Sequence, residues 1–387
     1  MIDFIRESRE MTQQLSAWRR DFHRHPELRF EEVRTADIVA AHLRSLDIET
    51  HTSIGKTGVV GLLEGQRQSP VVLLRFDMDA LPISEENAME YASQNPGVMH
   101  ACGHDTHVAM GLGAARLLAK YRTQLNGTVK FVFQPAEEGA GGARAMIDDG
   151  VLEQPKPDYV FGIHIDATRP TGVVAIGEGP ILAAADSFHI TIRGRGGHGA
   201  LPEQTVDALM TGVQVVGALQ TILSRNIGLL DSALISVCSF QSGAAFNIIP
   251  ETACLQGTIR TYDPSIQALV HQRMSEVVHH TASAYGASAE LDIKNIVPAA
   301  VNDPAMAALT RQLAAEIFRP QNVISDYRAA PSDDIAEFLS AAPGCQFILG
   351  AAVEGGYPHH NPRFDIDEAA MPLGVALLCK TASSLLI

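Results

Sequence analysis

Two patterns of apolar residues divide this chain. Near its start, apolar positions recur with helical spacing at 4–20 and 31–46, around a turn at His25-Pro26. Short apolar runs typical of strands then alternate with a helical segment at 108–122; the runs lie at 58–65, 71–80, 128–138 and 159–165. Apolar strands separated by helices predict a parallel or mixed sheet with helices on both faces.

The pattern changes near residue 183, where polar and apolar residues begin to alternate. The next elements follow the order strand, helix, strand, strand, helix, strand, at 186–196, 205–224, 233–240, 253–261, 265–285 and 288–294. This order is ferredoxin-like. Long helices and a strand at 345–350 then return. We therefore expect an α/β domain made of residues 1–182 and 295–387, with an inserted α+β domain, residues 183–294.

Composition narrows the class of protein. The 387 residues are 46% hydrophobic and 19% charged, which is typical of a globular enzyme. The net charge of −15 argues against nucleic-acid binding, so an anionic substrate needs a local metal ion or Arg. The charged N-terminus does not resemble a signal peptide, and no run approaches the roughly 18 apolar residues of a membrane span. Five widely spaced cysteines predict a reduced, cytoplasmic protein.

The octapeptide HACGHDTH, residues 100–107, is the strongest local signal of chemistry. Cys102 and His104 lie two residues apart on a glycine-containing loop that leads into a helix. A thiolate and an imidazole suit zinc and similar transition metals, and a loop can direct both toward one ion. A buried cysteine beside a polar loop is the alternative interpretation.

The segment QPAEEGAGG, residues 134–142, directly follows an apolar strand. The carboxyl ends of strands are where open α/β sheets place their sites. Two adjacent carboxylates, Glu137 and Glu138, cannot easily play the same role. One can bind a metal ion while the other takes a proton from the attacking water as general base. A solvated acidic turn is the alternative.

Further candidate residues lie at other strand ends. His164 ends the apolar run YVFGIHI, and either His359 or His360 of PHHNPRF is a plausible ligand. Asp77 and Asp79 end the run VVLLRFDMDA, where a carboxylate can orient a metal-binding imidazole through its second nitrogen. Each signal is weak alone, but together they predict a metal site at one edge of the sheet.

The motifs RFDMDALP, HACGHDTH, FQPAEE, GGHGALP, GTIRT and HNPRFDIDE occur in this order over nearly the whole chain. In this they resemble the aminoacylase branch of the co-catalytic metallopeptidases, which includes hippurate hydrolase and the indole-3-acetyl-amino-acid hydrolases. The resemblance implies a zinc-exopeptidase-like catalytic domain, an inserted ferredoxin-like lid that makes a homodimer, and hydrolysis of N-acyl-L-amino acids.

The resemblance also implies two divalent ions, zinc, manganese, cobalt or nickel, and the residues around them. The metal ligands it implies are Cys102, which bridges the ions, and His104, Glu138, His164 and His360. Glu137 is expected to be the catalytic base. In the lid, His198 is expected to approach the substrate carbonyl, and Asn247 and Arg260 to hold the substrate carboxylate.

Two departures from the family pattern concern the substrate. Glu203 stands where a second His usually follows GGHGALP, and Asp333-Asp334-Ile335 replaces Glu-Asp-Phe. We expect these changes to affect the acyl pocket or the residues behind it. A dipeptidase or carboxypeptidase, and a metal-binding protein without turnover, are the alternative functions. The segments 177–186 and 294–303 are the expected hinges of a moving lid.

Overall fold

The computed structural model describes residues 2–387, and their contacts divide them into two compact units. Unit 1 contains the residues up to Ile181, Ala300–Arg328 and Asp333–Ile387, and unit 2 contains Leu182–Ala299 and Ala329–Ser332. The chain leaves unit 2 after Ala299 rather than after residue 294, because the last strand of that unit runs on to Val297.

Unit 1 is built on an eight-stranded mixed sheet with the order β1-β2-β4-β3-β5-β16-β6-β15. Its centre, β4-β3-β5-β16, is parallel, whereas β1-β2 and β2-β4 are antiparallel pairs. The predicted α/β class with a mixed sheet is confirmed. The strands are β1 (Glu49–Ile54), β2 (Gly58–Glu64), β3 (Val71–Asp77), β4 (Thr128–Gln134), β5 (Tyr159–Pro170), β6 (Val174–Ala175), β15 (Val323–Ile324) and β16 (Gly344–Ala352).

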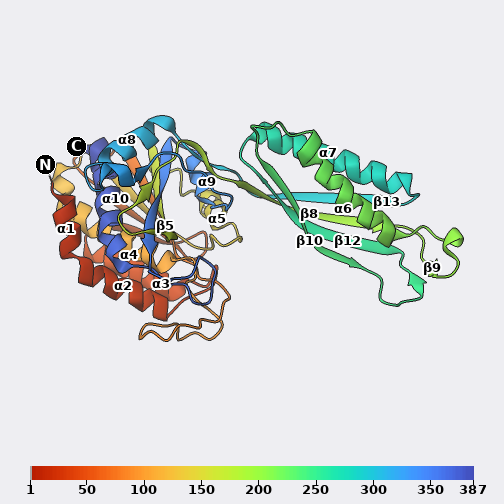
Figure 1. Ribbon diagram of the computed structural model, residues 1–387. Coiled ribbons are helices and arrows are strands. Elements are labelled where there is room, and N and C mark those ends of the chain that lie inside the picture. The colour runs from red at the N-terminus through yellow and green to blue at the C-terminus, as the bar shows by residue number, and fades with distance from the viewer. Residues whose placement is uncertain (1) are drawn as a thin grey trace. The chain divides into compact units, whose positions relative to one another are not determined.

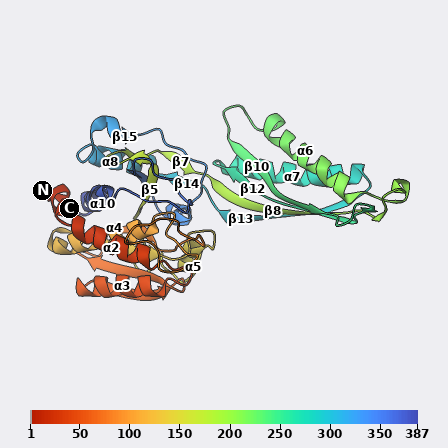
Figure 2. The same ribbon diagram turned by 60° about the horizontal axis from the view of Figure 1, so that its bottom comes forward.

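Helices cover both faces of this sheet (Figures 1 and 2). Val72 and Leu74 of β3 belong to the main hydrophobic cluster, whereas Leu73 belongs to a smaller one, because neighbouring side chains point to opposite faces. The main cluster takes in α1 (Phe4–Glu10), α2 (Thr12–Arg24), α3 (Val33–Ser45), α4 (His104–Lys120), α8 (Pro304–Ala314) and α10 (Met371–Leu386). The smaller one takes in α5 (Gly142–Asp148) and α9 (Ile335–Leu339).

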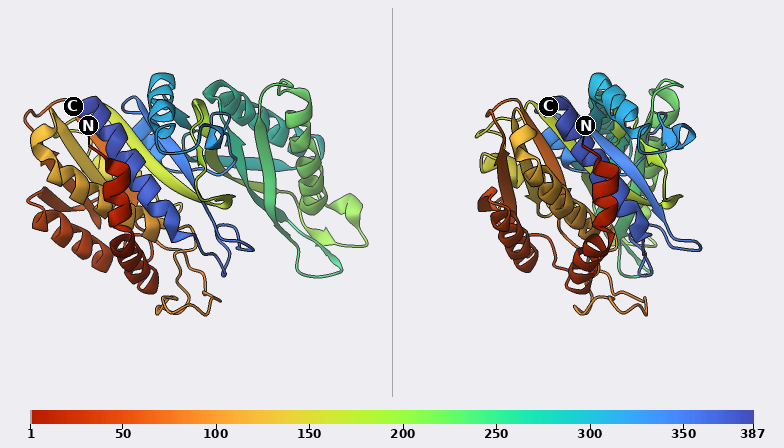
Figure 3. Two further views of the ribbon diagram at one scale, coloured as in Figure 1. Left: turned by 60° about the vertical axis from the view of Figure 1, so that its left-hand side comes forward. Right: turned by 90° about the vertical axis from the view of Figure 1, so that its left-hand side faces the viewer.

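The first and last helices, α1 and α10, lie side by side (Figure 3). The stretch Glu368–Leu386 is long and apolar enough to cross a membrane, although the sequence led us to expect no such stretch. Of its most apolar window, 72% is buried inside the protein. Its apolar residues, among them Val375 and Leu378, belong to the core of unit 1.

Unit 2 has a four-stranded antiparallel sheet with the order β10-β12-β8-β13. Helices α6 and α7 lie together on one face of it (Figure 1). The chain order strand, helix, strand, strand, helix, strand agrees with the ferredoxin-like prediction. The elements are β8 (Ala184–Arg193), α6 (Ala208–Arg225), β10 (Ala233–Ser242), β12 (Thr252–Thr261), α7 (Pro264–Ala284) and β13 (Ser288–Val297).

Short pairings complete the two units. In unit 2, β9 (Gly197–His198) pairs with β11 (Ile248–Ile249). A second two-stranded sheet joins β7 (Gly179–Leu182) to β14 (Ala300–Asn302).

Three sequence expectations about local structure differ from the observed one. The helix expected at 4–20 is interrupted at Met11, and α4 begins at His104, before the expected residue 108. The cysteines other than Cys102 were expected in the core. Cys345 and Cys379 are buried, but Cys238 is exposed, because it lies where the pairing of β10 with β12 shifts its register. All five cysteines are unpaired.

Candidate active site

The predicted metal ligands come together at the carboxyl ends of neighbouring strands in unit 1. Glu138 follows β4, His164 lies within β5, and His360 lies in the loop after β16. Cys102 and His104 come from the segment between β3 and the first turn of α4. Parallel strands present their carboxyl ends at one edge of the sheet, so side chains from four parts of the chain meet there.

Two groups of donor atoms share Cys102. In the first, Cys102, His104 and His164 place one donor atom each within 4.8 Å of one another. In the second, Cys102, Glu138 and His360 do the same. Within residues 2–387, every group of three or more possible donors that meets this distance belongs to this same site. The geometry therefore fits two adjacent ions with a shared thiolate.

The backbone around the donors is held in conformations that need special residues or strong support. Gly103 caps α4 at φ +91°, and a Cβ there would lie 2.3 Å from the Ile165 side chain. Ala136 and His360 have φ values of 54° and 65°, which are costly for residues with a side chain. A 2.8 Å hydrogen bond from the His360 N–H to the Ala101 carbonyl supports the second of these.

His104 directs one nitrogen into the centre of the site. Its Nδ1 lies 2.9 Å from the Asp79 carbonyl oxygen, so the ring donates there, and in the neutral ring Nε2 carries the lone pair. This Nε2 is buried and has no hydrogen-bond partner. An orphaned nitrogen beside a thiol and two carboxylates fits a metal ion, which would take that lone pair.

The other two imidazoles are also oriented. His164 donates from Nδ1 to the Ile165 carbonyl at 2.7 Å and places Nε2 3.6 Å from the Cys102 sulfur. Burial lowers the pKa of His164 to about 4, so its ring is neutral, the form that binds metals. His360 Nε2 lies 3.2 Å from Glu138 Oε1.

Burial raises the pKa of Cys102 well above its ordinary value. The thiolate is the form that binds a metal, so a divalent cation has to stabilise it here.

Glu137 lies beside the donors but among other acids. Burial, together with the charges of Asp333, Glu138 and Asp334, raises the pKa of Glu137 well above its ordinary value. Its Oε2 lies 3.9 Å from His104 Nε2. A cation bound at that nitrogen would favour the ionised form, which a general base requires.

The two aspartates after β3 have different partners. Asp79 was expected to orient a metal-binding imidazole through its carboxylate. Its backbone carbonyl oxygen lies 2.9 Å from His104 Nδ1 and its carboxylate 3.3 Å from the same nitrogen. The carboxylate also accepts the N–H groups of Glu137 and Glu138, at 3.0 Å each. Asp77 was expected to orient a predicted ligand too. Its Oδ1 instead lies 2.5 Å from His107 Nδ1.

Neither His107 nor Arg75 was predicted from the sequence, and His359 was named only as the alternative to His360 as a metal ligand. Arg75 is buried and ion-paired with Asp77, Asp333 and Asp334, at 2.6, 3.0 and 2.8 Å. The sequence did contain a signal for Arg75, because it is a charged residue inside the apolar run of β3. A buried Arg needs acidic partners, so such a position predicts an ion cluster.

The ion pairs of Arg75 also locate the residues that depart from the family pattern. Asp333, Asp334 and Ile335 are buried, and Ile335 packs against Gly162 of β5, where an added Cβ would lie 2.1 Å from Ile335 Cδ1. Asp333 and Asp334 lie beside Glu137, where each places a carboxylate oxygen within 4.8 Å of the Glu137 carboxyl.

The three predicted substrate residues lie in unit 2. His198 and Asn247 are exposed and neighbour each other through the β9-β11 pair and a 2.8 Å bond from the Gly199 N–H to the Asn247 carbonyl. Ala200 N–H donates to His198 Nδ1 at 3.0 Å. Arg260 of β12 is half-buried and donates to Thr258 Oγ1 and to the Ile259 carbonyl.

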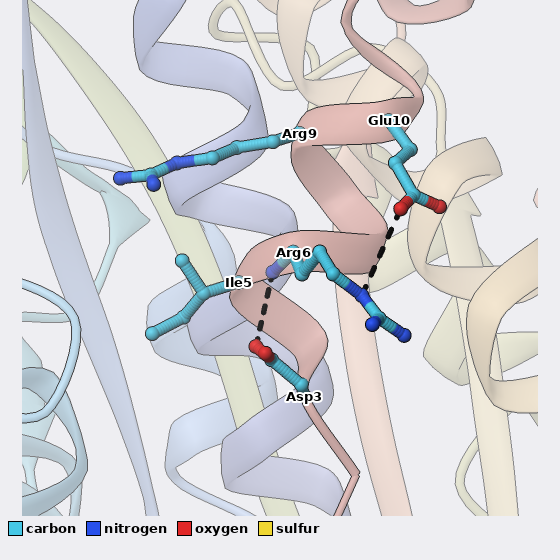
Figure 4. Close-up of a pocket in the computed structure, with 5 residues that line it drawn as sticks. All are labelled: Asp3, Ile5, Arg6, Arg9 and Glu10. Atoms are coloured by element: carbon cyan, nitrogen blue, oxygen red, sulfur yellow. Dashed lines mark hydrogen bonds and ion pairs between the residues drawn. The ribbon is translucent and has the colours of Figure 1, made fainter.

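A surface hollow elsewhere in unit 1 holds none of the predicted residues. It lies along α1, where Asp3 accepts the Arg6 N–H at 3.1 Å and Arg6 faces Glu10 at 3.7 Å (Figure 4). These are the contacts of an N-terminal cap and an exposed helical ion pair, and they carry no catalytic chemistry.

Comparison with known proteins agrees with this geometry. The model of Peptidase family M20/M25/M40 matches residues 73–384. Thermostable carboxypeptidase 1 of Saccharolobus solfataricus is 38% identical over 384 residues, which cover 96% of this chain and 96% of that protein. The N-acyl-L-amino acid amidohydrolase of Geobacillus stearothermophilus is 45% identical over 282 residues, which cover 73% of this chain and 76% of that protein.

A solved structure from Bacillus subtilis is also similar over the full chain. It is described as a dinuclear metal binding peptidase from the M20 family, is 32% identical, and has a TM-score of 0.86. The match covers 98% of this chain and 99% of that one. A relative with this fold is therefore described as binding two metal ions.

Proposed function

Because this chain belongs to Peptidase family M20/M25/M40, we propose that it hydrolyses the amide bond of N-acyl-L-amino acids, releasing a carboxylic acid and a free amino acid. One observation carries the proposal most: two groups of three donors share Cys102 and lie beside the buried carboxyl of Glu137. A relative at 45% identity is named for this reaction.

Five residues would hold the metal ions, and they are Cys102, His104, Glu138, His164 and His360. Two divalent ions bound there supply Lewis-acid polarisation of the substrate carbonyl and a lowered pKa for water. Thiolate and imidazole donors suit zinc, cobalt and nickel better than calcium or magnesium, and the carboxylate of Glu138 also suits manganese.

Glu137 moves the proton in this proposal. As general base its carboxylate takes a proton from the attacking water, and as general acid it then gives that proton to the nitrogen of the leaving amine. Asp79 accepts its backbone N–H, and Arg75 holds the nearby Gln134 side chain. These bonds fix the Glu137 carboxyl beside the donors.

The residues of unit 2 are assigned to the substrate. The Ala200 N–H occupies His198 Nδ1, so a neutral His198 carries its proton on Nε2 and can donate it to an oxyanion. Arg260 offers a planar guanidinium that suits the free carboxylate of the substrate, and Asn247 offers an amide for the same group. These roles rest on the chemistry of each side chain and on the family resemblance.

A carboxypeptidase or dipeptidase is the second candidate function. The observation that favours it is the 38% identity to thermostable carboxypeptidase 1 over nearly the whole chain. The same donors and the same base would serve a peptide bond. A metal-binding protein without turnover is disfavoured, because the carboxyl of Glu137, which can act as a general base, lies among the donors.

Hydrolysis assays decide between these functions. The protein is chelated, reloaded with zinc, manganese, cobalt or nickel, and given N-acetyl and N-benzoyl amino acids alongside plain dipeptides and C-terminally extended peptides. We expect the reloaded protein to cleave the N-acyl amino acids and the chelated protein to cleave none.

Cleavage of peptides alone would establish the carboxypeptidase or dipeptidase function instead. Binding of two ions without cleavage of any compound would establish a metal-binding protein. The N-acyl groups that are cleaved then show which acyl groups the pocket accepts.

We also propose a homodimer that forms through unit 2. β10 is an edge strand of its sheet, so its outer N–H and C=O groups are available to a second copy. Leu234 and Phe240 of β10, and Met210 and Val213 of α6, are large apolar side chains exposed by 38–48%. Unpaired edge strands and exposed apolar side chains on neighbouring elements are typical of a surface covered by a partner.

A pair of substitutions tests this surface. Met210→Glu together with Val213→Glu is expected to convert a dimer to a monomer in light scattering coupled to size-exclusion chromatography, because the charges have to be desolvated at the interface. Val33→Glu is the matched control, since Val33 is 59% exposed on α3 of unit 1. A wild-type protein that is already monomeric would contradict the proposal.

The compartment we propose is the cytoplasm. The support is the state of the cysteines, all five of which are unpaired, as a reducing compartment keeps them. The partner in that compartment is a small N-acylated amino acid, and the charge of −15 disfavours nucleic acid as an alternative partner.

A further inference from the structure

The edge of β5 beside β3 loses its strand partner just before the candidate metal site. β3 pairs with β5 only as far as Arg75 and Gly162, whereas β16 continues along the other edge of β5 to Pro170, with an irregularity after Asp166. Residues 165 and 167 are two apart in β5, so their N–H groups point to the same edge. Something other than a strand has to accept these buried or half-buried N–H groups.

Two imidazoles take the place of the missing strand. His107 Nε2 accepts the Ile165 N–H at 3.0 Å, and His359 Nε2 accepts the Ala167 N–H at 3.1 Å. Their Nδ1 atoms lie 2.5 Å from Asp77 Oδ1 and 3.2 Å from the Cys102 carbonyl oxygen. A ring that accepts at Nε2 and donates at Nδ1 is neutral and has one defined tautomer.

Both rings lie directly behind candidate metal ligands. The Ile165 peptide accepts the Nδ1–H of His164 on its carbonyl, so the residue that His107 holds also orients the His164 ring. The ring centroids of His107 and His359 lie 4.7 and 5.5 Å from that of His164. His359 in addition holds the carbonyl of Cys102, the shared donor of the two groups.

We propose that His107 and His359 are positioning residues that fix the part of β5 carrying His164 for metal binding, by accepting the Ile165 and Ala167 N–H groups. Neither ring has a nitrogen left for an ion, because each uses both. This inference rests on the two-metal centre proposed above.

His107 also forms a possible donor group with Asp77 and His104. The Ile165 N–H points at its Nε2, however, and Arg75 pairs with Asp77 at 2.6 Å, so His107 and Asp77 both have partners already. His359 and its neighbour His360 differ in the partner of Nε2. In His359 this nitrogen accepts the Ala167 N–H, whereas in His360 it faces the Glu138 carboxylate.

Paired substitutions distinguish the hydrogen bond that each ring accepts at Nε2 from the one that it makes at Nδ1. Gln can place an acceptor oxygen near the position of Nε2, whereas Asn can only reach the position of Nδ1 and leaves the strand N–H unpaired. The variants are His107→Gln, His107→Asn, His359→Gln and His359→Asn. His42→Gln is the control, because His42 is a half-buried imidazole of unit 1 that contacts the Leu112 carbonyl away from the site.

The measurement is a titration of the chelated protein with cobalt. The thiolate-to-cobalt absorption of Cys102 reports binding, and metal analysis gives the number of ions bound. Loss of a residue behind a metal ligand typically weakens metal binding tenfold to hundredfold. We expect about this loss for the Asn variants, less than about threefold for the Gln variants, and none for His42→Gln. Equal affinities in wild type, Gln and Asn variants would overturn the inference.

Failure of the metal centre itself would look different, because the wild-type protein would then bind no cobalt. If the variants do not fold, a measurement on the wild-type protein still tests the inference. Nitrogen-15 NMR of histidine-labelled protein loaded with cadmium-113 is expected to show His107 and His359 protonated on Nδ1 without coupling to cadmium. Coupling to cadmium, or a proton on Nε2 of either ring, would overturn the inference.

Discussion

Glu137 shows how a single side chain is prepared by its neighbours. Burial and the nearby carboxyls of Asp333, Glu138 and Asp334 raise its pKa, while Asp79 holds its backbone N–H at 3.0 Å. A carboxyl in such a place takes up a proton readily and is deprotonated when a cation binds beside it. Both states are needed by a group that accepts a proton and then returns it.

The first prediction concerns this residue. Glu137→Gln keeps the shape of the side chain and removes the base, so we expect kcat to fall by about 10²–10⁴-fold. The number of bound metal ions should stay the same, since Glu137 is not one of the five proposed donors. Steady-state kinetics on an N-acyl amino acid and metal analysis of the same preparation check this.

Glu64→Gln, at an exposed end of β2, serves as the control and should leave kcat unchanged. Full activity of Glu137→Gln would show that another group is the base. Loss of a metal ion in that variant would make Glu137 a ligand instead.

At the scale of elements, a buried ion cluster joins three segments of unit 1. Arg19 of α2 pairs with Asp105 in the first turn of α4 at 3.0 Å, and with Asp365 and Glu368 just before α10 at 2.8 and 3.3 Å. Arg19 and Asp105 have fully buried side chains. Although burial alone would raise the pKa of Asp105, Arg19 and His23 hold it well below its ordinary value.

Arg19→Met is expected to destabilise the protein by about 3–5 kcal/mol at pH 7, because it leaves a buried carboxylate without its main partner. Urea unfolding followed by circular dichroism measures this loss. Arg9→Met, an exposed substitution on α1, is the control and should change stability by less than about 0.5 kcal/mol.

The pH dependence of that loss has a defined sign. The lowered pKa of Asp105 contributes stability above the unfolded value of about 3.9, and this contribution disappears as the pH falls through the folded value. The difference between wild type and Arg19→Met should therefore narrow below about pH 4. A difference that grows toward low pH would contradict the proposed role of the ion pair.

At the scale of the whole molecule, each unit has a hydrophobic core of its own. The core of unit 2 contains residues of α6, α7 and its sheet, whereas all five candidate metal donors belong to unit 1. A ligand that binds only the folded state stabilises the part that holds it. Metal binding and the folding of unit 1 are thus coupled.

Hydrogen exchange with and without chelator tests this coupling. At an ion concentration a hundred times the dissociation constant, binding stabilises the folded state by about 2.7 kcal/mol, so exchange from unit 1 peptides around His104 and His164 should slow. Peptides from the core of unit 2, such as those containing Leu219 and Val278, are the internal control and should not change. Equal protection of both units would show that they unfold as one.

Much of this architecture was predictable because it is encoded locally. Apolar runs and their spacing predicted β3, β4, β5 and the elements of unit 2, since side chains alternate with period two in strands and 3.6 in helices. Motif chemistry placed Glu138 and His164 at strand ends and Cys102 on a loop that leads into a helix. The exposed strand β1 was not predicted, because its residues are polar and only its pairing with β2 identifies it.

The sequence by itself determined the types of donor, their positions after strands, and the order of elements in both units. Only the tertiary structure decided which partner each buried polar group has. His359 contacts the carbonyl of Cys102, 257 residues away, and Asp77 binds His107 rather than a predicted ligand. A buried hydrogen bond depends on the groups that packing brings within about 3 Å, and that proximity comes from contacts distant in sequence rather than from any local pattern.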